Sequence, residues 1–430
     1  MKILISSFGT RGDVQPYLAL AVGLQRASHQ VTLATSHTFS DWIHAYGVQT
    51  HPIRVSIQEV MQQPAVQAVL RSKNLLRQIR LLRAILGQNR ETAEVVWQAA
   101  QDADLIIQSP TGCCALEAAS KLGIPALFAS PLPVAPTRSF PSFFLGSMRF
   151  SLGGGYNFFT HRLMHFALWH GMSKHMVKPL RRTLGLSPLR SFADLLAECR
   201  RLGVPWLYGY SPHVLPKPRD WDMDQHVTGY WFLDTPPAWQ PPGDLLHFLV
   251  SGPPPIYIGF GSMGHGDPAR HTQLALRALA LSGQRGVLLT GWGGMAAPMP
   301  HDAFQSHNVF FVENIPHDWL FPQMAAVVHH GGAGTTGAGL RAGVPNLLTP
   351  FAPNDQVAWA ERVEKLGMGV RLPSIQQLTA EKLAAAIQVA LTDSTMRTRA
   401  TKLGEKIRSE NGIGEAVALI ERQAAQRRQA

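Results

Sequence analysis

The chain has 430 residues, 45% of them apolar, which is more than one hydrophobic core usually covers, so two domains are expected. A formal net charge of +11 favours an anionic partner, either a nucleotide, a nucleic acid or an acidic lipid surface, and does not choose among them. The cysteines are too few and too badly spaced for a disulfide framework or a zinc site, which predicts a reducing, cytoplasmic setting: Cys113, Cys114 and Cys199.

The amino-terminal residues form a pattern of strand, turn, helix and strand. An apolar run over 2–6 leads into a glycine turn, a helical pattern and a second β-rich run over 31–35, and similar runs return at 105–108 and 126–129. This order is typical of βαβ units, so we expect a parallel sheet whose carboxyl edge carries the functional loops. The first strand begins at the second residue and no run of about eighteen apolar residues occurs, so we expect neither a secretory leader nor a membrane span.

Asp13 ends the first strand-to-helix turn, so its carboxylate is expected at the carboxyl edge of the sheet, facing the second domain. A carboxylate in that place is a candidate general base. The competing interpretation is an N-cap for a helix over 14–28, which would suit aspartate equally well. The spacing of the residues does not decide between the two.

Two stretches of the first half point to a lipidic partner. Over 71–90, Arg and Lys alternate with Leu and Ile at helical spacing and without any acidic residue, which predicts either a helix lying on an anionic bilayer or an ordinary surface helix. The segment 131–169 is rich in Phe, Met and Leu and would line a pocket for a hydrophobic ligand or cover it with loops. The candidate pocket residues are Phe140, Phe143, Phe144, Met148 and Phe158.

Proline content divides the chain. Residues 235–255 are rich in proline, which interrupts helices and central strands, so we predict a linker there. It separates a first domain over 1–234 from a second domain over 256–412, each with alternating strands and helices. A last helix over 413–430 is expected to pack back on the first domain.

Residues 325–350 are predicted to form a buried strand, a glycine turn, a short helix and a second strand. Gly332 and Gly334 let the backbone approach a ligand, and free N–H groups at a helix N-terminus hold a phosphate without any cation. The His330 imidazole and the hydroxyls of Thr335 and Thr336 add hydrogen-bond donors. A tight turn that simply needs glycine is the plainer interpretation, but the histidine and threonines together favour a nucleotide diphosphate site.

Three further polar residues are expected near this turn. Asp355 and Gln356 follow the next strand on the same edge, where they can bind sugar hydroxyls, although Asp355 would also suit the N-cap of the helix over 357–366. Ser262 follows the strand over 256–260 and could reach a phosphate from the other side, or simply belong to a glycine turn.

Four segments carry a resemblance to a known family: 8–17, 228–233, 255–262 and 327–345. They resemble the sterol glucosyltransferases and, more widely, the family 1 glycosyltransferases, which include enzymes that glycosylate antibiotic aglycones. The resemblance spans nearly the whole chain. It implies the GT-B architecture, an α/β fold in which two Rossmann-like domains face each other across a cleft, with the acceptor in the first and the nucleotide sugar in the second.

The resemblance also implies roles for individual residues. Asp13 matches the carboxylate that activates the acceptor, where plant and macrolide members carry a histidine. His330 matches the ligand of the diphosphate, and Gly334 with Thr335 matches its backbone and hydroxyl donors.

On the sugar and base, Asp355 and Gln356 match the pair that holds the hexose, and Ile315 matches the residue whose backbone pairs with the base. Plant and macrolide members place a stacking tryptophan just before that point, where this chain has Asn314. Trp292 is the candidate to replace it.

The implied activity is inverting, metal-independent transfer of a hexose from a nucleotide sugar, UDP-glucose first, to a hydroxyl of a hydrophobic alcohol such as a sterol. No cofactor is expected, since the UDP-sugar is a co-substrate. The alternatives are an antibiotic, polyketide, carotenoid or hopanoid aglycone, a dTDP-sugar donor, or a UDP-sugar epimerase of the same architecture. The Asp-x-Asp patterns at 102–104 and 222–224 lie far from the glycine turn, so no metal is expected, and no nucleic-acid-binding motif is present.

Overall fold

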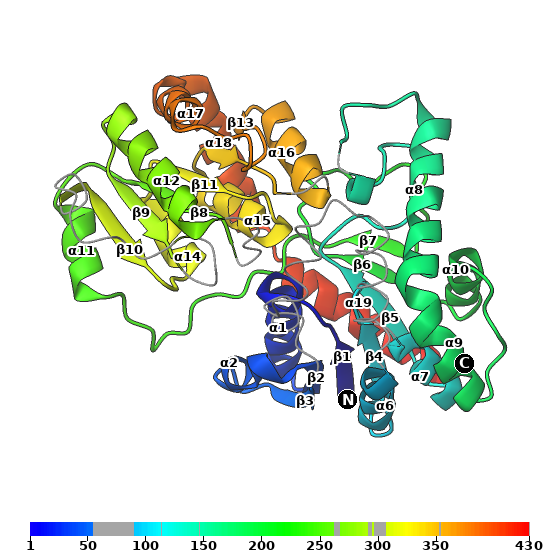
Figure 1. Ribbon diagram of the computed structural model, residues 1–430. Helices are drawn as coiled ribbons and strands as arrows, with labels where there is room; N and C mark the ends of the chain where they lie inside the picture. The colour runs from blue at the N-terminus through cyan, green and yellow to red at the C-terminus, as the bar shows by residue number, and fades with distance from the viewer. Residues whose placement is uncertain are drawn as a thin grey trace.

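The computed structural model describes residues 1–54, 90–112, 114–145, 147–261, 267–290, 295, 307–351 and 354–429. Two parallel sheets, each flanked by helices, make up these residues (Figure 1). This arrangement confirms the predicted α/β fold class with two Rossmann-like units.

The first sheet holds seven parallel strands in the order β3-β2-β1-β4-β5-β6-β7. Their bounds are β1 (Lys2–Ser6), β2 (Gln30–Ser36), β3 (Gln49–Ile53), β4 (Leu105–Gln108), β5 (Ala126–Ser130), β6 (Trp206–Tyr208) and β7 (Gln225–Val227). In the register, Leu4 pairs with Thr32 on one side and Ile106 on the other. The inner strands are apolar on both faces because helices cover both sides of a parallel sheet.

The second sheet holds six parallel strands in the order β10-β9-β8-β11-β12-β13. Their bounds are β8 (Ile256–Gly259), β9 (Gly286–Leu289), β10 (Val309–Val312), β11 (Ala326–His329), β12 (Asn346–Leu348) and β13 (Gly369–Arg371). β8 and β11 are neighbours at the centre, and every residue of both strands is buried. The loops after these two strands therefore emerge side by side at the carboxyl edge.

Helices follow the strands in both units. Those of the first are α1 (Arg11–Arg26), α2 (Ser40–His44), α6 (Arg90–Ala100), α7 (Ala115–Leu122), α8 (Gly154–Leu168), α9 (Lys174–Thr183) and α10 (Phe192–Arg201). Those of the second are α12 (Pro268–Ser282), α14 (His317–Leu320), α15 (Ala333–Ala342), α16 (Asp355–Lys365), α17 (Ala380–Thr392) and α18 (Ser394–Ser409). Many begin at a side-chain cap, as when Asp267 accepts a bond from the Ala269 N–H at 3.0 Å.

The proline-rich segment 235–255 differs in part from the predicted linker, because it contains helix α11 (Gly243–Val250). The prolines lie before and after this helix, and Pro242 stands at its N-cap, so none interrupts an intrahelical hydrogen bond. Leu245 of α11 is fully buried in a cluster with β8 and β11, which ties the end of the segment to the second sheet.

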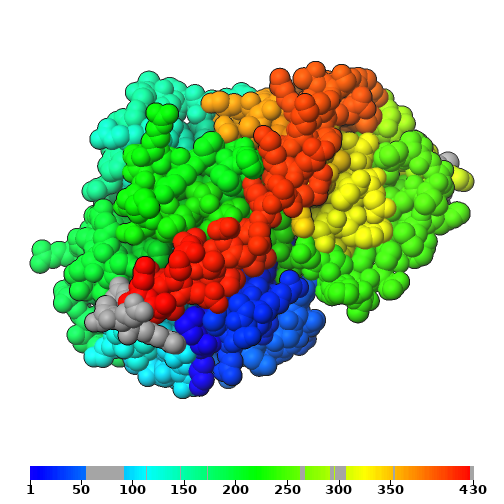
Figure 2. All heavy atoms as spheres, turned by 180° about the vertical axis from the view of Figure 1, so that it is seen from behind, coloured from blue at the N-terminus to red at the C-terminus, as the bar shows by residue number. Residues whose placement is uncertain are grey.

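The chain crosses between the two units a second time near its end. Helix α19 (Gly412–Gln429) packs against α1, and a side chain at Gly23 of α1 would lie only 2.2 Å from the Ile413 side chain. Figure 2 shows α19, in red, lying along the first domain beside the blue amino-terminal residues. The two crossings touch each other, since a side chain at Gly412 would lie 2.5 Å from the carbonyl oxygen of Tyr230.

Candidate active site

The carboxyl edge of β1 presents Asp13 in the first turn of α1. Thr10 is the N-cap residue, and both its N–H and its hydroxyl donate to Oδ2 of Asp13, at 2.8 and 2.9 Å. Asp13 is thus the third residue of the helix, so the structure corrects the alternative in which it caps a helix over 14–28. The capping box fixes the carboxylate while Oδ1 stays outside it.

Burial changes the acidity of Asp13. Loss of water raises the pKa of this half-buried carboxyl above its usual range, and the two bonds from Thr10 offset only part of that rise. A carboxylate with a raised pKa is a better proton acceptor than an ordinary aspartate.

The strand β11 ends in two histidines that have different surroundings. His329 is fully buried, accepts the Gly331 N–H at its Nδ1 at 3.1 Å and donates from Nε2 to Oδ1 of Asn346 at 3.0 Å. Both ring nitrogens are therefore satisfied, and burial lowers the pKa of His329 to about 3. His329 supports the turn from inside the domain, a role that the sequence did not predict.

His330 follows β11 at the turn into α15 and has an unsatisfied nitrogen. Its Nδ1 is buried and has no hydrogen-bond partner among the described residues, and burial lowers its pKa to about 4. The ring fits between two glycines, because a side chain on Gly261 would lie 2.6 Å from Cε1 and one on Gly332 would lie 2.6 Å from Nε2. The glycines thus make room for a neutral imidazole beside the start of α15.

Helix α15 begins without a side-chain cap, since Gly332 occupies the N-cap position. Its first N–H groups are therefore not used by a capping oxygen, as an anion site requires. Gly334 is exposed and Thr335 is half-buried at this end. Thr336 is fully buried, and its hydroxyl has no partner among the described residues.

The start of α16 lies at the same edge. Asn354 is the N-cap and accepts the Gln356 N–H at 3.1 Å, which corrects the alternative in which Asp355 caps this helix. Gln356 accepts the Phe351 N–H at Oε1 at 2.9 Å, so its amide nitrogen is the end left to other partners. Burial raises the pKa of Asp355 to about 7, and the Asp13 carboxylate adds to the rise. The two carboxylates thus repel each other across the two units.

Further contacts join the two units around this point. Nη1 of Arg11, in the first turn of α1, donates to Oδ1 of Asn314 at 3.0 Å, beside the buried Ile315. Burial is the main cause that lowers the pKa of His317 in α14 to about 4, and Arg11 and His330 contribute to it. α1 also contacts α15 directly. Asp13, His330 and Asp355 are therefore brought to one place from three separate segments.

A second interdomain contact was not predicted from the sequence. Glu361 of α16 is buried and accepts bonds from the Met148 and Arg149 N–H groups at 2.6 and 3.0 Å and from the Ser147 hydroxyl at 3.0 Å. Arg371 holds the other side of the carboxylate at 2.9 Å. We call this the Glu361 clamp. It attaches the segment before α8 to the second unit.

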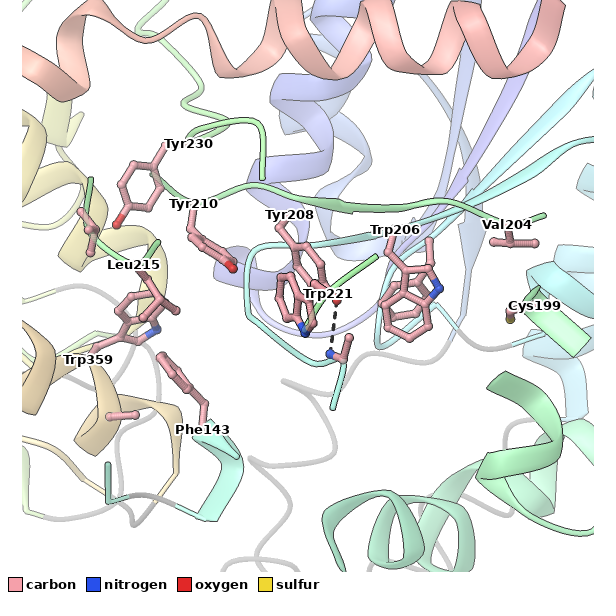
Figure 3. Close-up of a cluster of buried hydrophobic side chains, with 14 of the residues drawn as sticks. Phe143, Cys199, Val204, Trp206, Tyr208, Tyr210, Leu215, Trp221, Tyr230 and Trp359 are labelled. Atoms are coloured by element: carbon pink, nitrogen blue, oxygen red, sulfur yellow. Dashed lines mark hydrogen bonds between the residues drawn. The ribbon is translucent and has the colours of Figure 1, made fainter. Parts of the chain in front are cut away.

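The predicted hydrophobic pocket residues divide into two groups. Phe140 and Phe143 are 7% and 1% exposed, and the Phe143 ring packs against Trp359 of α16 with centroids 5.0 Å apart (Figure 3). Phe143 therefore belongs to an apolar cluster shared by both units. Phe144, Met148 and Phe158 are half-buried, so these three keep surface that a ligand could contact.

Three predictions lie outside the described residues. These are the phosphate contact of Ser262, the base-stacking role of Trp292 and the basic amphipathic stretch 71–90 up to its last residue, Arg90. In the part of the chain that is described, no group of three or more His, Cys, Asp or Glu side chains is placed to hold a metal ion. Nor does any described helix combine the length and apolarity needed to cross a bilayer.

Solved structures place this architecture in a class. The glycotransferase of kitacinnamycin superposes with a TM-score of 0.72 at 20% identity, covering 98% of both chains. The glycosyltransferase SnogD of Streptomyces nogalater gives 0.66 at 19% identity, covering 99% of both chains. The fold is therefore that of the GT-B glycosyltransferases.

Sequence comparisons identify the family. Residues 3–141 match the glycosyltransferase family 28 N-terminal domain, and 300–421 match the erythromycin biosynthesis protein CIII-like C-terminal domain. Sterol 3-beta-glucosyltransferases of Cryptococcus neoformans var. neoformans serotype D and Pichia angusta are 35% and 36% identical, over 98% and 97% of this chain. The chain belongs to the glycosyltransferases and is similar to these sterol 3-beta-glucosyltransferases. It spans only 27% and 33% of their lengths.

Proposed function

We propose that this chain transfers a hexose from UDP-glucose to the hydroxyl of a hydrophobic alcohol such as a sterol, with inversion and without a metal ion. The observation that carries the proposal is the contact of α1, which carries Asp13, with α15, whose N-terminus follows the unsatisfied imidazole of His330. The donor and acceptor classes follow the names of the curated relatives, which are sterol 3-beta-glucosyltransferases.

In this mechanism Asp13 accepts the proton of the acceptor hydroxyl. The oxygen attacks the anomeric carbon from the face opposite the nucleotide, so one C–O bond forms while the bond to the diphosphate breaks. An α-linked donor therefore gives a β-glycoside. The raised pKa of Asp13 supports the role, since it makes the carboxylate a stronger base.

The second unit stabilises the leaving diphosphate. His330 donates a hydrogen bond to a phosphate oxygen, and Gly332, Gly334 and Thr335 supply donors at the start of α15. Burial lowers the pKa of His330 to about 4, so the imidazole is a neutral hydrogen-bond donor before the donor substrate binds. Binding of the diphosphate anion would raise this pKa. Ser262 is proposed to contact the phosphates from the other side.

The hexose and the base are held by neighbouring segments. Asp355, with its pKa of about 7, exchanges hydrogen bonds with sugar hydroxyls, and Gln356 donates from the amide nitrogen that Phe351 does not use. The backbone of Ile315 is proposed to pair with the base, and Trp292 to stack on it.

The acceptor is proposed to bind against Phe144, Met148 and Phe158. These side chains follow β5 on the carboxyl edge of the first sheet, the edge that also carries Asp13. Their partial exposure supports a surface that an apolar ring system could cover.

The test is product analysis. The protein is incubated with UDP-glucose or a dTDP-sugar and a panel of sterols and of polyketide, carotenoid and hopanoid aglycones, and the masses formed are read. We expect a sterol hexoside, and a donor converted without any acceptor would instead indicate an epimerase. Asp13→Asn should lower kcat by about 10²–10⁴-fold while UDP affinity stays within twofold or so. Unchanged turnover would remove Asp13 from the role of base.

A further inference from the structure

Helix α8 has its polar residues on the inside. Asn157, Thr160, His161 and His165 are buried, between 1% and 7% exposed. Nε2 of His161 donates to the Phe140 carbonyl at 3.1 Å, and Nε2 of His165 donates to the Val134 carbonyl at 3.2 Å. Hydrogen bonds to one loop therefore anchor the helix, where an ordinary surface helix would use an apolar stripe.

The apolar residues of α8 face outward. Phe159, Leu163 and Phe166 are 60%, 45% and 61% exposed, and their spacing of four and three residues places them on one face of the helix. The segment just before the helix continues this exposure with Leu145, Phe150 and Leu152, at 41%, 58% and 72%. We call these six side chains the α8 surface. Apolar surface gathered in this way usually marks a contact site.

Basic side chains are exposed along this surface, and the acidic Glu361 and Glu364 at its edge are paired with Arg149. No acidic residue occurs in the sequence between Glu117 and Asp194. Arg162 is exposed on the same helical face as Phe159 and Phe166, and Lys178 and Arg182 are exposed on the following helix, α9. Figure 1 shows α8 on the right-hand side of the molecule, with α10 beside its lower half. A surface of this kind fits a partner that is apolar within and negatively charged at its boundary.

We infer that the α8 surface docks on an anionic phospholipid bilayer, with Phe159, Leu163 and Phe166 entering the acyl boundary and Arg162 meeting the lipid phosphates. The acyl region of the bilayer matches the apolar side chains of the helix, and the anionic headgroup region matches the arginine. His161 and His165 then connect the bound surface to the loop after β5, which carries Phe140. The inference stands on the exposure and charge of α8 and does not depend on the proposed function.

The test uses the full chain and vesicles of phosphatidylcholine with about 30 mol% phosphatidylserine, compared with pure phosphatidylcholine, in a flotation assay. We expect binding to the anionic vesicles and at least about tenfold weaker partitioning for Phe159→Ser combined with Leu163→Ser and Phe166→Ser. Arg162→Glu should lower binding to the anionic vesicles alone.

The matched control changes Val250, Leu281 and Val389 to Ser, which are 80%, 55% and 45% exposed in the second unit. We expect it to float as the unchanged protein does. Circular dichroism melting shows that each variant folds. No vesicle binding by the unchanged protein, or equal binding by the α8 variant and the control, would overturn the inference. The inference would also be overturned if light scattering showed that the unchanged protein is a dimer and that the α8 variant is a monomer which still binds vesicles.

Discussion

The turn proposed to bind the donor (the donor turn) and the segment proposed to bind the acceptor (the acceptor side) are built on opposite plans. The donor turn, over 326–346, uses buried strands, a satisfied His329 and glycines that leave space for one imidazole. In the acceptor side, over 131–168, helix α8 places polar side chains inward and apolar ones outward, and the segment before it is attached to the second unit through Glu361. The difference indicates that the donor turn is preorganised within the second unit, whereas the acceptor side depends on contacts with the other unit.

The largest effect is expected from the apolar contact between the units. Phe143→Ala should lower the free energy of unfolding by about 3–5 kcal/mol, because the lost phenyl ring is only 1% exposed and packs against Trp359. Phe158→Ala, at a half-buried position, should cost about 1 kcal/mol or less and raise the acceptor KM instead. Urea unfolding measures the free energy of unfolding of both variants, and steady-state kinetics measures their acceptor KM. If Phe143→Ala kept its stability and raised only the acceptor KM, Phe143 would line the pocket.

His330→Ala should lower kcat by about 10²–10³-fold, since it removes a donor to the leaving diphosphate. Gly332→Ala tests the same imidazole indirectly, because its added carbon would lie 2.6 Å from Nε2 of His330. We expect roughly tenfold weaker UDP binding by calorimetry, from a displaced ring. Gly243→Ala is the control, with open space around its added carbon. A Gly332→Ala variant with unchanged UDP affinity would contradict the tight fit.

The Glu361 clamp should be sensitive to loss of charge. Glu361→Gln keeps the volume but weakens the bonds from Met148, Arg149 and Arg371, so we expect a loss of about 1–3 kcal/mol in unfolding free energy. The acceptor KM should rise while the donor KM stays unchanged. Glu364→Gln, which breaks a more exposed pair with Arg149, should cost about 1 kcal/mol or less. Equal losses in the two variants would show that the clamp has no special role.

The smallest effect concerns pH. The folded protein holds the Asp355 proton up to about pH 7, whereas an unfolded aspartate releases it near pH 4, so folding stability should fall as the pH rises through that window. Asp355→Asn removes this dependence. At pH 8 we expect the variant to have a higher melting temperature than the unchanged protein, corresponding to at least about 1 kcal/mol of unfolding free energy. At pH 5 the two proteins should differ less in melting temperature. An identical pH profile would contradict the raised pKa of the buried Asp355.

Local patterns predicted the fold and much of the donor turn. The strand over 2–6, the turn around His330 and the position of Asp13 each depend on residues close in sequence, so spacing and turn chemistry were enough. The caps were misjudged by one to three positions, because Thr10 and Asn354 compete with the aspartates that follow them.

Long-range contacts could not be found in this way. Glu361 meets Met148 more than two hundred residues earlier, and Trp359 meets Phe143 over a similar interval, so no local pattern reports either pair. The two adjacent histidines also look equivalent in sequence. Only the fold shows that Asn346 engages His329, whereas Nδ1 of His330 is left without a partner among the described residues.

The contact between the two crossings has a consequence for any relative motion of the two units. Gly229 lies where the chain leaves the first unit, and Gly412 lies where it returns. A side chain on Gly229 would lie 3.1 Å from Cα of Gly412, and one on Gly412 would lie 2.5 Å from the Tyr230 carbonyl oxygen. Two connections that meet at one point act as a pivot. We therefore expect the units to open by swinging about Gly229 and Gly412, a motion that parts Asp13 from Asp355 while leaving both sheets intact.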